Sequence, residues 1–311
     1  MRLVSSSGDP ELAMVHVAED DRGRRIEFVD SVQPPRPRSE KWVVIVSTMF
    51  GCPVGCRMCD AGGRPQGMLS ADEMLWQVRT AVSRLPTTGG PVTSMLKVQF
   101  ARMGEPSLNP AVVEALDALP GEFHGTTVVA SVSTIAPKGS GRFLSRLKEV
   151  KDRRYGGGRF QLQFSVHSTD PERRAWLCPA RTLSLEEMAS AGTAFRAPGD
   201  KKVTLNFCLI EGVPLDPAVV RDAFDPEDFL VKLTPLNPTA RAAAHGLRSV
   251  IGPGTEGRAA PVVEAFRSQG FETILSIGEY EENRIGSNCG MYLGVPRDED
   301  AERPYGGPAR I

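Results

Sequence analysis

Three of the six cysteines of the chain lie within eight residues of one another, at Cys52, Cys56 and Cys59. A closed structural zinc site needs four ligands, whereas three thiolates can hold three corners of a cubic iron–sulfur cluster and leave its fourth iron open. Gly51 and Gly55 allow the backbone between these cysteines to fold around a metal. The C-x3-C-x2-C spacing therefore predicts a [4Fe-4S] cluster, with a zinc knuckle completed by a distant histidine as the alternative.

The segments around this loop alternate between apolar runs typical of buried strands and amphipathic runs typical of helices. Two of the expected helices begin with a capping box, Ser70 with Glu73 and Ser184 with Glu187. Such alternation favours an α/β fold with a parallel sheet, either open or closed into a barrel. The expected strands of this sheet are residues 41–48, 94–101, 126–134, 159–167, 201–210 and 229–236, with a last extended piece at 271–277.

Polar segments rich in Gly and Pro follow most of these strands. The cysteine loop follows the first strand, and the other segments are residues 102–110, 132–139, 165–169 and 234–238. Because the carboxyl ends of parallel strands meet at one edge of a sheet, these segments should share one rim, where active sites of such sheets lie. The sequence therefore predicts one site built from several strand ends.

The overall charge limits the class of partner. The chain has 37 Lys and Arg against 38 Asp and Glu, a net charge of −1, whereas proteins that bind folded nucleic acid usually carry a basic surplus. Residues 22–25 and 151–159 are the densest basic runs, and we interpret them as solvated charge beside turns. RNA is therefore not the expected partner.

The apolar segments also bear on the location of the chain. No apolar run reaches the roughly 20 residues of a membrane span, and the N-terminus has no apolar signal region. We therefore expect a cytoplasmic chain that does not engage a membrane. In a reducing compartment, clustered cysteines bind metals or act in catalysis more often than they form disulfides.

The sequence predicts three regions. Residues 1–41 form a short N-terminal β-hairpin and a Pro-rich connector, residues 42–295 the main body, and residues 296–311 a flexible tail. The first ten residues and the tail are polar and rich in Gly, Pro or charge, so we expect both to be poorly ordered.

The cysteine loop at the end of the first main strand matches the signature of the radical SAM (S-adenosylmethionine) superfamily. MGEP, at 103–106, matches the superfamily segment that contacts the amino group of SAM. Further segments, in order, resemble one family, the bacterial rRNA and tRNA adenine methyltransferases of the RlmN/Cfr type, which methylate C2 or C8 of adenine. These segments, spread over residues 42–293, are QGMLSADEMLWQV, MGEPSLN, VST, SVH with DPERR, VTLNFCLIEGV, LTPLNP and GSNCG.

This resemblance implies the fold, the cofactors and the roles of particular residues. It implies a partial (β/α)6 radical SAM barrel with a short N-terminal β extension, a [4Fe-4S] cluster on the three clustered cysteines, SAM, and an external electron donor of the flavodoxin or ferredoxin type. The positions that would contact SAM are Gly104, Glu105, Ser133, Ser165, Val166, His167 and Asn237.

The resemblance also implies a methyl-carrying thiol, Cys289. This thiol would take a methyl group from one SAM, and a second SAM, cleaved reductively at the cluster, would yield a 5′-deoxyadenosyl radical. That radical removes a hydrogen from the methylated Cys289. The resulting carbon radical can add to an electron-poor sp2 carbon that electrophilic methyl donors do not reach, so the cofactor supplies the chemistry and the protein supplies placement.

The chain departs from the family pattern at two catalytic positions. Ile45 stands where the family has a second thiol that resolves the covalent adduct, and Ala13 stands where it has an acidic residue. Cys208 or Cys178 could replace the missing thiol, and strand alternation places Cys208 on the same face as the polar Asn206. Only about 40 residues precede the main body, where the family carries a sizeable RNA-binding domain.

We therefore expect a radical SAM methyltransferase that methylates an sp2 carbon of a small molecule, a nucleotide-like metabolite or a peptide. One alternative is an RNA adenine C2/C8 methyltransferase with a reduced docking domain. The others are a radical SAM enzyme with non-methylating chemistry and a non-catalytic iron–sulfur or zinc protein. Cleavage of SAM to 5′-deoxyadenosine distinguishes the enzymes from the last alternative.

Overall fold

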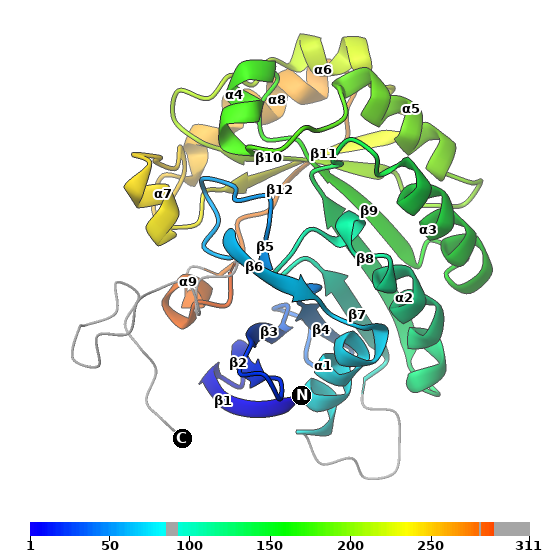
Figure 1. The fold of residues 1–311 in the computed structure, drawn as a ribbon. Coiled ribbons are helices and arrows are strands. Elements are labelled where there is room, and N and C mark those ends of the chain that lie inside the picture. The colour runs from blue at the N-terminus through cyan, green and yellow to red at the C-terminus, as the bar shows by residue number, and fades with distance from the viewer. Residues whose placement is uncertain (85–92, 280, 289–311) are drawn as a thin grey trace.

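A computed structural model describes residues 1–84, 93–279 and 281–288, and it contains a ten-stranded sheet covered by helices on its outer face (Figure 1). The strand order is β1-β2-β3-β4-β7-β8-β9-β10-β11-β12, so the sheet curves without closing on itself. Its parallel strands are β4 (Lys41–Val46), β7 (Met95–Phe100), β8 (Thr127–Thr134), β9 (Phe160–Ser165), β10 (Val203–Leu209), β11 (Phe229–Pro235) and the short β12 (Thr273–Leu275). The predicted α/β class and partial (β/α)6 barrel are confirmed.

Helices connect successive parallel strands and cover the outside of the sheet (Figure 1). They are α1 (Ala71–Ser83), α2 (Ala111–Glu122), α3 (Gly141–Arg154), α4 (Pro171–Leu177), α5 (Leu185–Phe195), α6 (Pro217–Ala223), α7 (Ala240–Ala244) and α8 (Ala260–Ser268), with 3-10 turns η1 (Pro106–Leu108) and η2 (Glu256–Ala259). The last described helix, α9 (Glu281–Ile285), follows β12 and contacts β1 and β2. Both predicted capping boxes form, at the starts of α1 and α5. Within the described ranges, no helix is long and apolar enough to cross a membrane.

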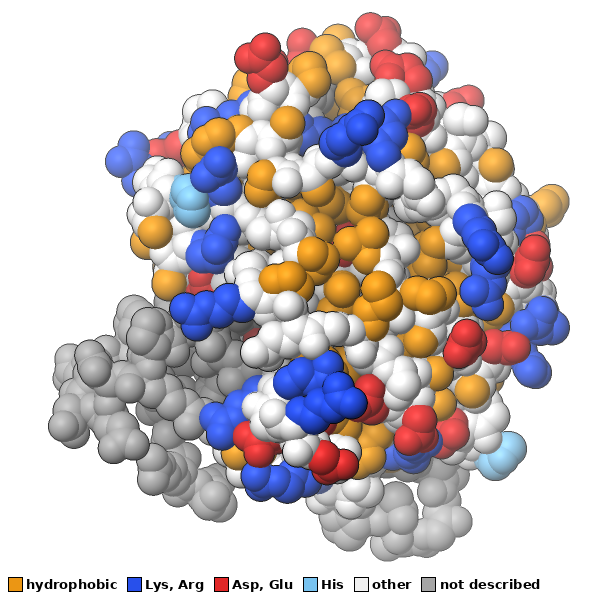
Figure 2. Space-filling model, in the orientation of Figure 1, with side chains coloured by type: hydrophobic (Ala, Val, Ile, Leu, Met, Phe, Trp, Pro, Cys, Tyr) orange, Lys and Arg blue, Asp and Glu red, His pale blue; other side chains and the backbone are white. Residues whose placement is uncertain are grey.

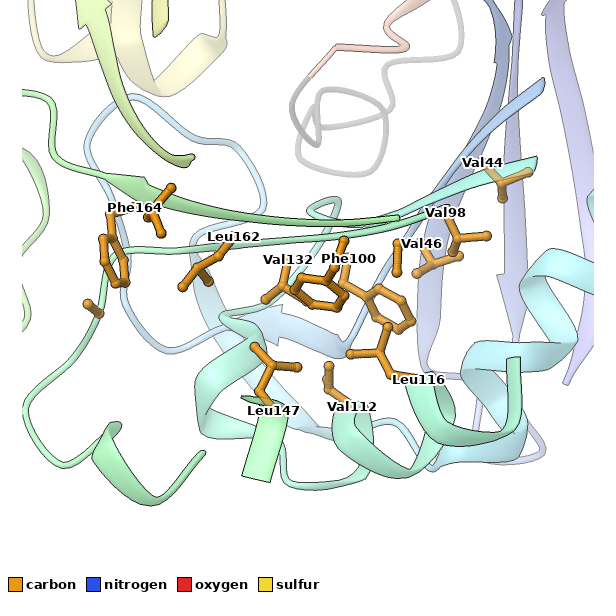
Figure 3. Close-up of a cluster of buried hydrophobic side chains, with 14 of the residues drawn as sticks. Val44, Val46, Val98, Phe100, Val112, Leu116, Val132, Leu147, Leu162 and Phe164 are labelled. Atoms are coloured by element: carbon orange, nitrogen blue, oxygen red, sulfur yellow. The ribbon is translucent and has the colours of Figure 1, made fainter. Parts of the chain in front are cut away.

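Strand alternation separates an apolar outer face from a polar inner face. On β7, Val98 and Phe100 are fully buried against the helices, whereas the alternating Lys97 and Gln99 face the other way. Figure 3 shows the outer layer, where α2 contributes Val112 and Leu116 and α3 contributes Leu147. Burial of this layer fixes the register of the strands, because a slip of one residue would turn every apolar side chain inward.

The N-terminal extension has three strands instead of the predicted hairpin. β2 (Ala13–Glu19) and β3 (Arg25–Val32) pair antiparallel as expected, but β1 (Arg2–Asp9) adds to β2. The expectation of disorder for the first ten residues was therefore wrong, because backbone pairing with β2 orders a polar segment that has little apolar surface to bury. β3 also pairs antiparallel with β4, so the extension continues the sheet of the barrel. The predicted tail, 296–311, lies outside the described residues.

The cysteine loop forms a separate small element over the barrel. β5 (Met49–Cys52) and β6 (Gly63–Met68) make a two-stranded antiparallel ribbon that encloses the loop. The ribbon lies near the centre of the view in Figure 1, over the carboxyl ends of the parallel strands. The cysteine loop thus follows the first parallel strand, β4, as predicted.

Candidate active site

The three clustered cysteines lie on a loop whose backbone is held by side chains from distant parts of the chain. Arg57 Nε donates to the carbonyl of Trp176 at 2.8 Å, and Thr239 Oγ1 donates to the carbonyl of Met58 at 2.9 Å. Arg241 donates to the carbonyls of Gly55 and Cys56, at 2.9 and 3.2 Å. These hydrogen bonds hold the loop between α4 and α7. The sequence alone did not indicate that these two helices support the cysteine loop.

Glycine is required where the loop begins. Gly51 has φ +74°, and a Cβ built there would lie 2.5 Å from the carbonyl oxygen of Arg64 on the opposite strand of the ribbon. Any other residue would have to open the ribbon that carries Cys52. Gly51 is thus needed for the close pairing of the ribbon, and its role in folding the backbone around a metal stays a prediction.

All three cysteines border one cavity of about 440 Å³ at the mouth of the barrel. Across the described residues, no three His, Cys, Asp or Glu side chains converge as they would on a single metal ion. A [4Fe-4S] cluster has a different requirement, because each thiolate binds its own iron and the ligands stand apart. The open space bounded by three thiols therefore fits a cluster better than the mononuclear zinc alternative.

Burial controls the protonation of these thiols. It raises the pKa of Cys52 to about 12, and the neighbouring Cys178 thiol together with burial raises the pKa of Cys56. Both are therefore neutral thiols near pH 7 in the absence of a cation. Bound iron would deprotonate them, since metal binding to cysteine releases protons.

Most of the predicted SAM positions face the same cavity. Six of the seven line it, namely Gly104, Glu105, Ser133, Ser165, His167 and Asn237. Val166 is fully buried, and its backbone N–H donates to the Asn206 carbonyl at 2.9 Å. The fold thus gathers residues from four strand ends around the cysteine loop, while their contacts with SAM stay a prediction.

Glu105 has a structural role that the sequence did not reveal. Its buried carboxylate accepts hydrogen bonds from Ser107 N at 3.1 Å, Ser107 Oγ at 2.7 Å, Ile135 N at 3.0 Å and the Thr134 hydroxyl. These donors tie the loop after β7 to the end of β8. Burial raises the pKa of Glu105 overall, although these hydrogen bonds oppose the rise.

Two buried polar atoms at the site, His167 Nδ1 and Asn206 Oδ1, have no hydrogen-bond partner among the residues that the structure describes. His167 has φ +64°, and burial, with a smaller effect of Arg174, lowers its pKa to about 4. The imidazole is therefore neutral at pH 7. Because unpaired buried polar atoms are costly, both atoms are suited to contact a bound molecule.

The two candidate replacement thiols occupy different places. Cys208 lines the cavity beside Asn206, as strand alternation predicted, and its Sγ lies 3.4 Å from the carbonyl oxygen of Pro235. Cys178 is buried behind the cysteine loop, with its Sγ 3.5 Å from Cys56 Sγ. Ile45 also borders the cavity. Cys208 is thus the better placed of the two to meet a substrate.

The remaining catalytic prediction, Cys289, lies outside the described residues, but the segment just before it is anchored. The Arg102 guanidinium donates to the Gly286 carbonyl at 2.7 Å and to the Ser287 carbonyl. It also forms an ion pair with Glu27 at 2.8 Å, and both side chains are almost completely buried. Nothing in the sequence indicated this contact except the position of Arg102 next to MGEP.

Comparison with known proteins gives the following matches. A probable dual-specificity RNA methyltransferase RlmN of Chlorobium phaeobacteroides is 30% identical over 290 residues, which is 90% of this chain and 74% of the relative. The RlmN of Halorhodospira halophila is 28% identical, covering 66% of this chain and 56% of the relative. A probable RNA methyltransferase of Pseudomonas paraeruginosa is 33% identical, covering 66% and 56%. No family model matches the chain.

Solved structures show the same fold. A radical SAM methyltransferase from Sphaerobacter thermophilus superposes with a TM-score of 0.73 at 22% identity, covering 94% of this chain and 81% of that chain. SuiB from Streptococcus suis, bound to S-adenosylmethionine, superposes with a TM-score of 0.52 at 14% identity, covering 86% and 55%. At these identities the likeness shows the fold alone.

Proposed function

Because the chain belongs to the RlmN-type family of radical SAM methyltransferases, we propose that it methylates an sp2 carbon of a small molecule, a nucleotide-like metabolite or a peptide. The observation that carries this proposal is a single cavity, which brings the three clustered cysteines together with Glu105 and Cys208. Thiolates of Cys52, Cys56 and Cys59 would hold the cluster, which, when bound, supplies the electron for reductive cleavage of SAM. The anchored segment that precedes Cys289 would place the methyl-carrying thiol.

In this proposal, Cys208 resolves the covalent adduct between Cys289 and the substrate. Cys208 lines the cavity, and its thiolate would attack the sulfur of Cys289 in the adduct. A Cys208–Cys289 disulfide would form as the S–CH2 bond breaks, the electron pair of that bond and a proton would leave a methyl group on the substrate, and an external thiol would then reduce the disulfide. Replacing Cys208 by Ala should therefore trap a covalent enzyme–substrate adduct, visible by mass spectrometry of the intact protein. Cys178→Ala is the matched control and should turn over without an adduct. Unchanged turnover of Cys208→Ala would remove this role.

The proposed substrate class follows from the charges near the surface. Both basic runs singled out in the sequence are paired with carboxylates. Arg24 and Arg25 pair with Asp20 and Glu19 at 2.8 and 2.7 Å. In the second run, the pairs are Lys151 with Asp152 and Asp200, and Arg153 and Arg154 with Asp117. Few of these cations are free to neutralise phosphates, on which RNA affinity depends strongly.

The face that carries the cysteine loop shows the same mixture of charges. In Figure 2, Lys and Arg side chains lie around a central hydrophobic patch, and Asp and Glu side chains are interspersed toward the edges. A cavity of about 440 Å³ is within the range for small-molecule sites. These observations support a substrate smaller than a folded RNA.

RNA adenine methylation is the second candidate, favoured by the names of the relatives, which describe RNA methyltransferases. The test is a methyl-transfer assay with labelled SAM on total RNA that lacks the family's adenine modification. We expect weak RNA binding and no labelled 2-methyl- or 8-methyladenosine. Label in either nucleoside would overturn the small-substrate proposal and establish the second candidate.

The methylating chemistry has its own test. Protein incubated with SAM should gain one methyl group on Cys289, detected by peptide mass spectrometry, and Cys289→Ala should transfer no methyl group to substrate. If the reconstituted protein forms 5′-deoxyadenosine while Cys289 stays unmethylated, the non-methylating alternative is correct.

A further inference from the structure

The inner face of the barrel carries two lysines that the proposed chemistry does not use. Lys97 lies on β7 and Lys232 on β11, and both line the cavity that the cysteines border. Each stands three residues before the end of its strand, at Phe100 and Pro235. At about 3.3 Å per residue, both therefore lie about 10 Å below the rim.

The Lys97 ammonium is weakly compensated. Its Nζ donates to Gln161 Oε1 at 3.2 Å, and Gln161 Nε2 donates in turn to Thr204 Oγ1 on β10 at 3.1 Å. Both side chains in this hydrogen-bonded chain are neutral, so neither balances the charge of Lys97. Within the described part of the chain, no carboxylate forms an ion pair with Lys97. Lys97 is half-buried, and a partly desolvated ammonium without a counter-charge is stabilised by an anionic partner.

The charges around Lys97 add to this cost. Among the described residues, the charged groups that act on Lys97 are Lys232, Lys41 and Lys201, and all three are cations. Burial first, and these cations second, lower the pKa of Lys97 to about 8, so most of it is still protonated at pH 7. The inner end of the cavity is therefore a region of positive potential inside a low-dielectric wall.

Hydrogen-bonding groups surround this region. Gln99, Gln161 and Gln163 line the cavity beside Lys97. Asn206, which opposes Lys232 in the pairing of β10 with β11, carries the unpartnered Oδ1 described above. An oxygen without a donor, beside Lys232 and in the same cavity as Lys97, points to a ligand that presents an acidic group and a nearby hydroxyl or N–H.

We propose that Lys97 and Lys232 bind an acidic group of the substrate, a carboxylate or a phosphate, at the inner end of the barrel. This inference rests on the proposed function, because it names the class of substrate that the site takes. The acidic group would sit about 10 Å below the rim, and the carbon to be methylated would lie near the cysteine loop and Cys208. Asn206 Oδ1 would accept a hydrogen bond from the body of the substrate.

The test is a calorimetric titration of the reconstituted, SAM-saturated protein at pH 7 and constant ionic strength. Inorganic phosphate, acetate and dimethyl phosphate are titrated separately. We expect phosphate or acetate to bind at one site, and the stronger of the two identifies the acidic group. Dimethyl phosphate represents the diester of a nucleic-acid backbone, and binding of this probe alone would overturn the proposal.

Variants locate the site. Lys97→Met and Lys232→Met should each weaken binding of the anion at least about tenfold, because a charge-assisted contact is lost. Lys148→Met is the control, since Lys148 lies on the exposed side of α3 and pairs with Asp152 at 2.7 Å. It should leave the affinity unchanged. No binding of any anion, or equal binding by the wild type and both barrel variants, would overturn the proposal.

Two further measurements keep the outcomes separate. Lys97→Gln serves as a second variant if Lys97→Met fails to fold, and thermal unfolding of each variant shows whether the fold is intact. Cys289 methylation by SAM needs no substrate, so it should persist in both lysine variants. Anion binding without Cys289 methylation in the wild type would reject the methyl-transfer proposal and retain the anion site.

Discussion

At the scale of single residues, the cysteines of the site differ in whether their thiols border the cavity. Cys52, Cys56 and Cys59 border the open cavity, whereas Cys178 is buried against Cys56 with 3.5 Å between the two sulfurs. In the proposed cluster, a thiol in that place would donate a weak hydrogen bond to the Cys56 thiolate, a contact that tunes cluster potential without binding iron. Cys178 therefore lies next to a proposed iron ligand, Cys56, and we do not expect it to bind iron itself.

Replacing any of the three loop cysteines by Ala should abolish the cluster, because each thiolate would bind its own iron. The measurement is iron and sulfide content after anaerobic reconstitution, together with an EPR signal that shifts when SAM is added. Cys178→Ala is the matched control and should retain full iron content. Stoichiometric zinc without iron uptake would contradict the cluster.

Lys97 should make anion binding depend on pH. Its pKa of about 8 means that it loses its charge as the pH rises from 7 to 9, while acetate stays ionised throughout that range. Acetate affinity should therefore fall by about tenfold between these values. Calorimetry at several pH values measures this, and Lys97→Met should show a flatter profile. An affinity that rises with pH would contradict the assignment.

At the scale of elements, a buried ion pair connects the N-terminal extension, the end of β7 and α9. Glu27 lies on β3, Arg102 follows β7, and the Arg102 guanidinium donates to the carbonyls of Gly286 and Ser287 just after α9. Three segments that are distant in sequence thus meet at one guanidinium. Its planar, multiple donors suit this role better than a lysine would.

Arg102→Met should reduce stability by about 3–5 kcal/mol, because it leaves Glu27 buried without its cation. The double variant Arg102→Met/Glu27→Met should recover most of that loss, since no buried charge remains unpaired. It should still methylate Cys289 more slowly, because the carbonyl anchors are gone. Urea unfolding measures the first effect and peptide mass spectrometry the second. Normal Cys289 methylation in the double variant would show that the anchor does not position this segment.

At the scale of the whole molecule, the N-terminal strands are part of the barrel sheet. β3 pairs with β4 along Val29–Val32, and Phe28 is fully buried in the main core. Asp30 binds His16 Nε2 at 2.7 Å and Trp42 Nε1 at 3.1 Å, which joins β2, β3 and β4. The boundary predicted at residue 41 therefore does not coincide with a break in the sheet.

Phe28→Ala should lower the free energy of unfolding by about 3–5 kcal/mol, as expected for a large buried aromatic. Deletion of residues 1–32 should prevent folding, because it exposes the edge of β4 and removes part of the core. Urea denaturation followed by circular dichroism measures the first effect, and solubility with a cooperative thermal transition tests the second. Cooperative folding of the deletion variant would show that the extension is independent of the barrel.

The sequence by itself determined the features that are encoded locally. The spacing of Cys52, Cys56 and Cys59 needs only one loop, and the alternation of apolar residues along strands and helices needs only one element at a time. This alternation predicted a parallel sheet, open or closed into a barrel, with the polar segments on one rim. The resemblance of the motifs to a known family implied the partial barrel, so both could be stated before any contact was known.

The tertiary structure decided which distant side chains meet. The contact of Cys178 with Cys56, the anchoring of Ser287 by Arg102, and the arrangement of Lys97 and Lys232 around one cavity each join segments more than 100 residues apart. β1 became a strand only because β2 offered an edge. Such contacts leave no periodic trace in the sequence, because they depend on how the sheet curves and on which strands it brings face to face.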